Sequence, residues 1–181
     1  ADAATRLRAR DGLFELGGDD ETMVRIAMGL GSDVAYCLDD APAVVEGLGD
    51  EIVRTPAVSG DVLLIVPGFG CATGRVYGAY DESPVELRAA EVHAMASSGV
   101  IDCGVLFNDL AAPARRVSPA LDRLVLQLGE MAPAGLDVHV TGSGSTCFAY
   151  APPGESAGLF ALSDAIEDQC EGVSTLVCSL S

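Results

Sequence analysis

Residues 138–151 read Val-His-Val-Thr-Gly-Ser-Gly-Ser-Thr-Cys-Phe-Ala-Tyr-Ala, and this stretch specifies the architecture of the second half of the chain. Val138 and Val140 alternate with polar neighbours, which is the period of a half-buried β-strand. The apolar run from Cys147 to Ala151 predicts a second strand. The glycine-rich segment between the two predicts the turn that connects them.

The elements on either side extend this pattern. Upstream, an apolar stretch over 62–66 predicts a strand, and Pro119 marks the first turn of a helix. Downstream, a helix over roughly 155–169 precedes a strand over 173–180. The stretch of about 72–117 is interpreted as a largely helical insertion. Without it the order is βαββαβ, the split βαβ pattern of ferredoxin-like domains, so we expect an α+β fold.

The first 60 residues predict helices and a small hairpin. Two helices come first, and Gly17-Gly18 is expected to end the first of them. Two short apolar stretches, 43–45 and 51–53, are separated by glycines and predict the hairpin. Within the later insertion, Ser83-Pro84 is expected to break the helical stretch into two pieces.

The composition argues against several classes of function. The chain of 181 residues carries 27 Asp and Glu against 10 basic residues, and all ten basic residues are Arg. A net charge of −17 argues against binding to nucleic acid or to an anionic membrane, because both require a positive surface. The acid surplus fits either a salt-rich interior or a GC-rich genome, and the sequence does not separate the two.

Membrane insertion and export are not expected either. The longest unbroken apolar run, Val62 to Pro67, is far shorter than the roughly 20 residues that a spanning helix needs. The first sixteen residues mix charged with apolar side chains and show no signal peptide. We therefore expect a cytoplasmic protein whose six cysteines are reduced thiols. The spacing of His and Cys suggests no metal site.

The segment Thr141-Gly-Ser-Gly-Ser-Thr146 carries the strongest local signal of chemistry. Its two glycines allow positive φ, so that consecutive N–H groups can point into one anion-sized concavity. The hydroxyls of Ser143, Ser145 and Thr146 can add donors for a phosphate. The alternative is a tight hairpin that needs glycine for its geometry and nothing more.

Three further sites are weaker. Asp33 follows a glycine-closed helix and could be a general base, although an ordinary N-cap formed by Ser32 or Asp33 is favoured by the pattern alone. Asn108-Asp109 stands at a chain reversal and is interpreted as a cap or a turn. Tyr77 lies on a short helix where an aromatic ring can stack on a ligand or pack. The two His residues are interpreted as structural or surface groups.

Taken in order, four segments resemble the GHMP kinase superfamily, and within it the kinases that act on 4-diphosphocytidyl-2-C-methyl-D-erythritol. The resemblance covers nearly the whole chain. Its segments are Leu30-Gly-Ser-Asp-Val34, Leu64-Ile-Val-Pro-Gly68 with Tyr77 downstream, Asn108-Asp-Leu110, and Thr141-Gly-Ser-Gly-Ser-Thr146. Each is weak alone, and the ordered set is fairly specific.

The resemblance implies phosphoryl transfer from ATP, with Mg²⁺, to the 2-hydroxyl of that cytidyl diphosphate sugar alcohol in non-mevalonate isoprenoid biosynthesis. Asp33 matches the catalytic aspartate, which takes the proton of the substrate hydroxyl. Tyr77 matches an aromatic residue placed against the cytosine ring. The nucleotide-binding positions that match the third superfamily motif are Gly142, Ser143, Gly144, Ser145 and Thr146.

The chain departs from the family pattern at its start. The family places a glycine-rich phosphate loop before the helix that begins this chain, and a catalytic Lys earlier still, whereas this sequence contains no Lys. We therefore expect an incomplete and inactive part of a kinase. Residues 1–60 would be the remainder of its N-terminal domain and 61–181 its C-terminal domain, with the insertion at about 72–117. The alternatives are another GHMP kinase or a non-catalytic ferredoxin-like module that binds a ligand or partner. The sequence carries no signal of oligomeric state.

Overall fold

The computed structural model of the chain describes residues 2–14, 20–39, 41–49, 51–85 and 88–180. The predicted helix stop at Gly17-Gly18 lies outside these residues. The chain packs as two compact units, each of which draws on two stretches of sequence. The first unit is Ala1–Ala57 with Arg88–Gly99, and the second is Val58–Leu87 with Val100–Ser181.

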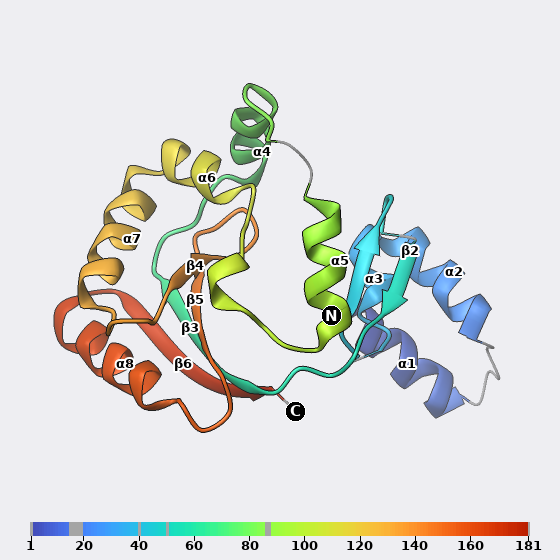
Figure 1. Cartoon of the computed structure of the whole chain (residues 1–181). Coiled ribbons are helices and arrows are strands. Elements are labelled where there is room, and N and C mark those ends of the chain that lie inside the picture. The colour runs from blue at the N-terminus through green and yellow to red at the C-terminus, as the bar shows by residue number, and fades with distance from the viewer. Residues whose placement is uncertain (1, 15–19, 40, 50, 86–87, 181) are drawn as a thin grey trace. The chain divides into compact units, whose positions relative to one another are not determined.

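The first unit combines helices with one small hairpin (Figure 1). Its core combines small buried side chains such as Ala27 and Ala35 with the larger Leu38. His93 lies 3.3 Å from the Glu46 carboxylate, a contact that joins the last helix of the unit to the hairpin. The elements are α1 (Asp2–Phe14), α2 (Asp20–Leu30), α3 (Ser32–Tyr36), β1 (Ala43–Glu46), β2 (Glu51–Arg54) and α5 (Ala89–Ser98).

The second unit is built on a four-stranded antiparallel sheet with the strand order β4-β5-β3-β6. Helices α7 and α8 cover one face of this sheet (Figure 1). The strands are β3 (Gly60–Pro67), β4 (Val138–Val140), β5 (Cys147–Ala151) and β6 (Val173–Leu180). The helices are α4 (Thr73–Asp81), the 3-10 helix η1 (Cys103–Val105), α6 (Ala111–Val117), α7 (Pro119–Met131) and α8 (Ala157–Gln169).

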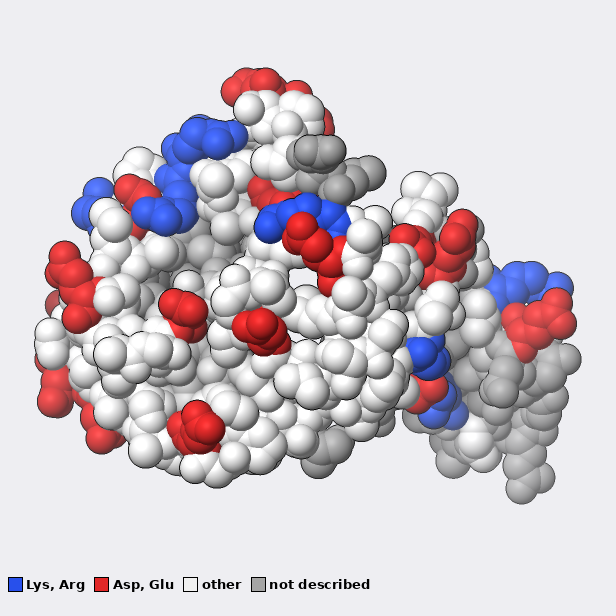
Figure 2. Space-filling view, in the orientation of Figure 1, with Lys and Arg blue, Asp and Glu red and all other residues white. Residues whose placement is uncertain are grey.

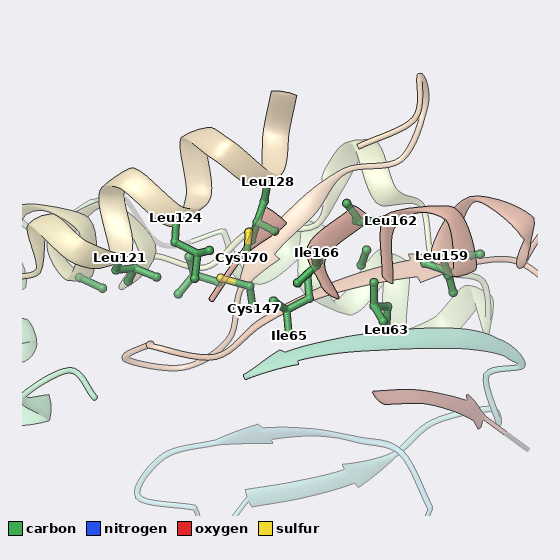
Figure 3. Packing of buried hydrophobic residues seen from close by; sticks show 14 of the residues in the cluster. Leu63, Ile65, Leu121, Leu124, Leu128, Cys147, Leu159, Leu162, Ile166 and Cys170 are labelled. Atoms are coloured by element: carbon green, nitrogen blue, oxygen red, sulfur yellow. The ribbon is translucent and has the colours of Figure 1, made fainter. Parts of the chain in front are cut away.

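The core of the second unit follows from the periodicity of its elements. Leu63 and Ile65 alternate along β3 and are both fully buried on the face that the helices cover. Helix α7 begins where the Ser118 hydroxyl accepts a hydrogen bond from the Leu121 amide, with Pro119 at its first position. Figure 3 shows the apolar side chains that meet between sheet and helices, among them Leu121, Leu124, Leu128, Leu159, Leu162 and Ile166.

The predicted α+β fold is confirmed. Numbered along the chain, the four strands stand in the order 2-3-1-4, which is that of a split βαβ domain, and the helices of the insertion lie between β3 and α7. The hairpin of the first unit and the break near Ser83-Pro84 are also confirmed. All six cysteines are unpaired in the structure.

The division into residues 1–60 and 61–181 stays a prediction about domains. The units of the structure change over between residues 57 and 58, and the segment that carries α5 belongs to the first unit. The expected insertion is therefore shared, with α4 and α6 in the second unit and α5 in the first.

Candidate functional site

The segment Thr141–Thr146 forms a closed loop between β4 and β5. The Thr141 amide donates to the Thr146 carbonyl over 3.0 Å, which closes the base of the loop. Inside it, the Gly144 amide donates to the Thr141 carbonyl over 3.0 Å. Gly142 and Gly144 adopt φ values of 54° and 76°, the left-handed region that side chains rarely occupy. The predicted positive φ at both glycines is thus present.

The two glycines of the loop are required for different reasons. A Cβ atom at Gly144 would come within 3.0 Å of Leu121 Cδ2 and 3.2 Å of Cys71 Sγ. A Cβ at Gly142 would meet nothing within 4 Å. Gly144 is therefore fixed by packing against α7 and the segment after β3 as well as by its backbone conformation, whereas Gly142 is fixed by conformation alone.

Asn108 holds the loop from outside. Its Nδ2 group donates to the Val140 carbonyl over 2.7 Å and to the Gly142 carbonyl over 2.8 Å. Its Oδ1 atom accepts a hydrogen bond of 3.0 Å from the Leu110 amide. One half-buried side chain thus ties the end of β4 and the start of the loop to the segment that leads into α6. The interpretation of Asn108 as a turn residue is confirmed. Its hydrogen bonds to the Val140 and Gly142 carbonyls are an additional role that the sequence did not predict.

Two serines of the loop bond to the segment that follows β3. Ser143 Oγ lies 3.0 Å from the Oγ1 atom of Thr73, at the first position of α4. Ser145 is 9% exposed, and its hydroxyl donates to the Phe69 carbonyl. Because that proton is already engaged, the Ser145 hydroxyl does not donate to a ligand in this arrangement. The donors left to a phosphate at this position are backbone amides and the neighbouring hydroxyls.

A pocket of about 300 Å³ lies beside the loop. Phe107, Asn108, His139, Gly142 and Phe148 are among the residues that line it. The rings of His139 and Phe148 stand 5.4 Å apart, centroid to centroid. Burial lowers the pKa of His139 below its ordinary value of 6.5, against a smaller opposing effect of the Asp137 charge. The pocket therefore presents a neutral imidazole at pH 7 beside an aromatic ring.

Asp33 lies in the first turn of α3, in the first unit, and is exposed. The N-cap position of this helix belongs to Gly31, so the expectation that Ser32 or Asp33 forms the N-cap is wrong. Helix α3 begins directly after α2 because a single glycine separates them, and this leaves the aspartate one position inside the helix rather than at its boundary.

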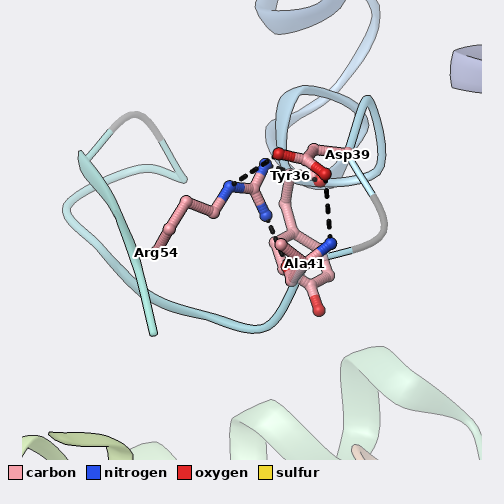
Figure 4. Close-up of polar contacts among 4 residues, drawn as sticks. All are labelled: Tyr36, Asp39, Ala41 and Arg54. Atoms are coloured by element: carbon pink, nitrogen blue, oxygen red, sulfur yellow. Dashed lines mark hydrogen bonds and ion pairs between the residues drawn. The ribbon is translucent and has the colours of Figure 1, made fainter. Parts of the chain in front are cut away.

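Arg54 anchors the chain that leaves α3 (Figure 4). Its guanidinium donates to the Ala41 carbonyl over 2.7 Å and to the Tyr36 carbonyl over 3.3 Å. It also lies 3.5 Å from the Asp39 carboxylate and 5.5 Å from the centre of the Tyr36 ring. The last residue of β2 thereby fixes the C-terminal end of α3, the helix that carries Asp33.

Tyr77 projects from α4 in the second unit. Its side chain is 51% exposed, while the preceding residue, Val76, is fully buried in the core. The ring is thus available for stacking rather than used for packing. The expected position on a short helix after a glycine-rich turn is confirmed, and the proposed contact with a nucleobase stays a prediction.

The described part of the chain contains neither a cluster of metal-ligating side chains nor a membrane-spanning helix. Within it, no three His, Cys, Asp or Glu side chains gather as ligands for a metal ion. None of its helices is both long enough and apolar enough to cross a bilayer.

Comparison with proteins of known function gives a consistent result. The 4-diphosphocytidyl-2-C-methyl-D-erythritol kinase of Rhodospirillum rubrum is 32% identical over 154 residues, which is 82% of this chain and 49% of that protein. The kinase of the same name from Moorella thermoacetica is 32% identical over 167 residues, or 87% of this chain and 57% of that protein. The chain is a distant homologue of these kinases, which belong to the GHMP kinase family. It spans about half the length of the curated relatives that it matches. No protein-family model matches the chain.

Solved structures support the same fold. The crystal structure of a 4-(cytidine 5'-diphospho)-2C-methyl-D-erythritol kinase superimposes with a TM-score of 0.75 at 23% identity, over 99% of this chain and 63% of that one. A homoserine kinase from Cytophaga hutchinsonii superimposes with a TM-score of 0.56 at 16% identity, over 94% of this chain and 60% of that one. The mixed α+β architecture of the GHMP kinases is therefore present here.

The four segments that resemble GHMP kinases are distributed over both units. Two of them meet in the second unit, where Asn108 bonds to the Gly142 carbonyl of the loop 141–146. A third, Leu64–Gly68, lies at the end of β3, and Phe69 and Thr73, which follow it, bond to the same loop. The fourth, which contains Asp33, belongs to the first unit. Sequence reasoning missed Arg54, because nothing in its neighbourhood indicates contacts with residues 13 to 18 positions earlier.

Proposed function

We propose that this chain is part of a small-molecule kinase that transfers the γ-phosphate of ATP to the 2-hydroxyl of 4-diphosphocytidyl-2-C-methyl-D-erythritol. The observation that carries the proposal is the loop 141–146, which is closed on itself and held by Asn108 in a chain homologous to such kinases. Positive φ at two glycines allows consecutive backbone amides to point toward one anion, as a phosphate-binding turn requires.

The proposed chemistry assigns separate tasks to the two units. The loop amides and the hydroxyls of Ser143 and Thr146 would bind and orient phosphate oxygens. The Asp33 carboxylate would orient the attacking hydroxyl and accept its proton. Tyr77, with half of its side chain exposed, would stack on the cytosine ring. In phosphoryl transfer most of the rate enhancement comes from such positioning and charge stabilisation.

Mg²⁺ would arrive with ATP, held mainly by phosphate oxygens and water. A kinase needs only one or two carboxylates for this ion, so a cluster of three protein ligands is not required. When bound, the ion would neutralise charge on the β- and γ-phosphates.

Residues 1–181 do not supply every group that this reaction uses. The sequence contains no Lys, so a Lys partner for Asp33 would have to come from outside this stretch. The same holds for the glycine-rich loop that family members place before the first helix of this chain. The proposal therefore assigns activity to a longer gene product that functions in the cytoplasm, and expects residues 1–181 alone to be inactive.

The test is a kinase assay on the complete gene product with the cytidyl substrate. We expect ATP-dependent ADP release that requires this substrate, and no turnover by residues 1–181 alone. Asp33→Asn should lower kcat by about 10²- to 10⁴-fold, because that is the contribution of a positioned general base. Asp164→Asn serves as the control, since Asp164 is an exposed carboxylate on α8.

Each result bears on a different part of the proposal. Turnover of homoserine in place of the cytidyl substrate would assign the chain to another GHMP activity. Retention of more than a tenth of kcat in Asp33→Asn, with an unchanged far-UV spectrum, would remove Asp33 from catalysis. Absence of turnover with every alcohol tested would favour the non-catalytic module.

A further inference from the structure

The arginines of the second unit are unevenly distributed. All four of them, Arg75, Arg115, Arg116 and Arg123, lie on α4, α6 and α7. Figure 2 shows blue atoms gathered over α6 and α7 on a surface where red atoms are scattered. The chain as a whole has a net charge of −17, so a local concentration of guanidinium groups differs in sign from the rest of the molecule.

Two of these arginines line a pocket between α4 and α6. Its volume is about 450 Å³, within the range of ligand sites of roughly 300–1,000 Å³. Its walls are Arg75, Gly78, Ala79, Glu82, Arg116 and Val117. Three of them belong to α4, and Glu82 is the C-cap residue that follows it. These four recur at intervals of three, one and three, which places them on a single face of the helix and its end. Gly78 and Ala79 are small, so this face leaves room for a ligand.

The arginines of the region are not equivalent. Arg115 bonds to the Asp122 carboxylate over 2.7 Å, so its charge is compensated within the fold. Arg116 instead donates from Nη2 to the Ala79 carbonyl over 2.9 Å. That bond orients the guanidinium at the pocket wall and leaves its charge without a carboxylate partner in that contact. Orientation before binding lowers the entropic cost of binding an anion.

We infer that the pocket between α4 and α6 is a binding site for the phosphate group of a small organic molecule. Arg75 and Arg116 bind the phosphate, because guanidinium groups match its oxygens in geometry and charge. Glu82, the C-cap residue of α4 on the same side of the pocket, accepts a hydrogen bond from a hydroxyl of the same ligand. The small apolar surface of Ala79 and Val117 contacts its carbon skeleton.

This site is separate from the one proposed for phosphoryl transfer. Tyr77 stands two positions from Arg75 on a helix that turns by 100° per residue, so its side chain projects from nearly the opposite face of α4. The loop 141–146 contacts α4 only at Thr73, the helix start, in the hydrogen bonds that the described residues make. The inference thus stands whether or not the chain is part of a kinase.

The test is a titration of residues 1–181 with inorganic phosphate, pyrophosphate and glycerol 3-phosphate, followed by amide and arginine Nε resonances. The buffer contains EDTA. Its salt concentration is kept low, because interactions between exposed charges are screened at high ionic strength. We expect saturable shifts at Gly78, Ala79 and Val117. Tighter binding of glycerol 3-phosphate than of phosphate would identify an organic ester as the ligand, and the reverse order would identify the free anion.

Variants separate a built site from general attraction to positive charge. Arg75→Gln and Arg116→Gln should each weaken binding by about tenfold or more, since hydrogen bonds to charged groups are the strong ones. Arg123→Gln, an exposed arginine outside the pocket, should change affinity by less than about twofold. Glu82→Gln should tighten the binding of inorganic phosphate, because it removes a negative charge from the wall.

The opposite results would overturn the inference. An equal loss of affinity in Arg123→Gln and Arg75→Gln would show attraction to net charge rather than a site. Shifts confined to the loop 141–146 would place phosphate binding elsewhere. If no resonance shifts saturably with up to 20 mM of each probe, the site has no affinity on the order of millimolar or tighter, and the inference is excluded. Because Arg116 also bonds to the Ala79 carbonyl, the affinity of Arg116→Gln is compared only if its melting temperature is unchanged. Arg75→Gln gives the same test of the pocket at a second arginine.

Discussion

The hydrogen bonds of Asn108 predict a measurable cost when the side chain is removed. Asn108→Ala deletes three bonds of 2.7, 2.8 and 3.0 Å, to the Val140 and Gly142 carbonyls and from the Leu110 amide. A protein hydrogen bond contributes about 1 kcal/mol net, so the loss should be about 3 kcal/mol. The cost falls on the loop and on the end of β4, because two of the three partners lie there.

Native-state hydrogen exchange is the appropriate assay, since a chain of two compact units need not unfold in one step. The amides to follow are those of Thr141 and Gly144, which donate to the Thr146 and Thr141 carbonyls. We expect their free energy of exchange to fall by up to 3 kcal/mol in Asn108→Ala. Amides of the β1–β2 hairpin in the first unit report whether the effect is local.

Two companion variants define the control and the refutation. Asp102→Ala removes a single bond of 3.0 Å from the Gly104 amide, in the same segment of the chain, and should leave the Thr141 amide unchanged. Asn108→Asp keeps the acceptor for Leu110 but places a carboxylate against two carbonyl oxygens, so it should destabilise at neutral pH at least as much as alanine. A change below about 0.5 kcal/mol in Asn108→Ala would refute the assignment of Asn108 as the residue that holds the loop.

Two further outcomes follow from the loop and from the pocket beside it. Gly144→Ala should destabilise the second unit by about 2 kcal/mol, because positive φ and two contacts of 3.0 and 3.2 Å both oppose a Cβ atom there. Gly142→Ala should destabilise it by about 1 kcal/mol, because only positive φ opposes the Cβ. Equal unfolding midpoints of the two variants in urea would contradict this. Burial lowers the pKa of His139, so the unfolded chain binds the proton first as the pH falls. The contribution of the neutral His139 to the free energy of unfolding is therefore complete above pH 6.5 and declines below it. His139→Gln should reduce that part of the pH dependence of stability between about pH 7.5 and 5.

The fold was predictable because its signals are local. The alternation of Val138 and Val140, the apolar run of β5 and the capped start of α7 each identify an element within a few residues. The membership of α5 in the first unit was not predictable. Its contacts with β1 join residues that are more than 40 positions apart, and no periodicity within α5 indicates that partner.

The candidate site was predictable only in part. The glycines and hydroxyls of the loop mark it in the sequence, and their conformation agrees with the prediction. Asn108 carried the signal of a turn, but its main partners are 32 and 34 residues away, beyond any local pattern. The N-cap was misplaced by one position for Ser32 and two for Asp33, because Gly31 rather than a polar side chain occupies it.

The way the loop is held bears on what it can do. Each side chain that becomes fixed only when a ligand binds reduces the free energy of binding by about 0.5–1.5 kcal/mol. Here the order is supplied in advance. Asn108, from the segment before α6, and the Phe69 carbonyl and Thr73, from the segment after β3, already fix the loop. A phosphate that binds to the loop amides would therefore meet donors that need little reorganisation, which is the condition under which backbone dipoles stabilise developing charge most effectively. A loop that served only to join two strands would need its glycines, but it would not need an asparagine 34 residues away to hold the Gly142 carbonyl.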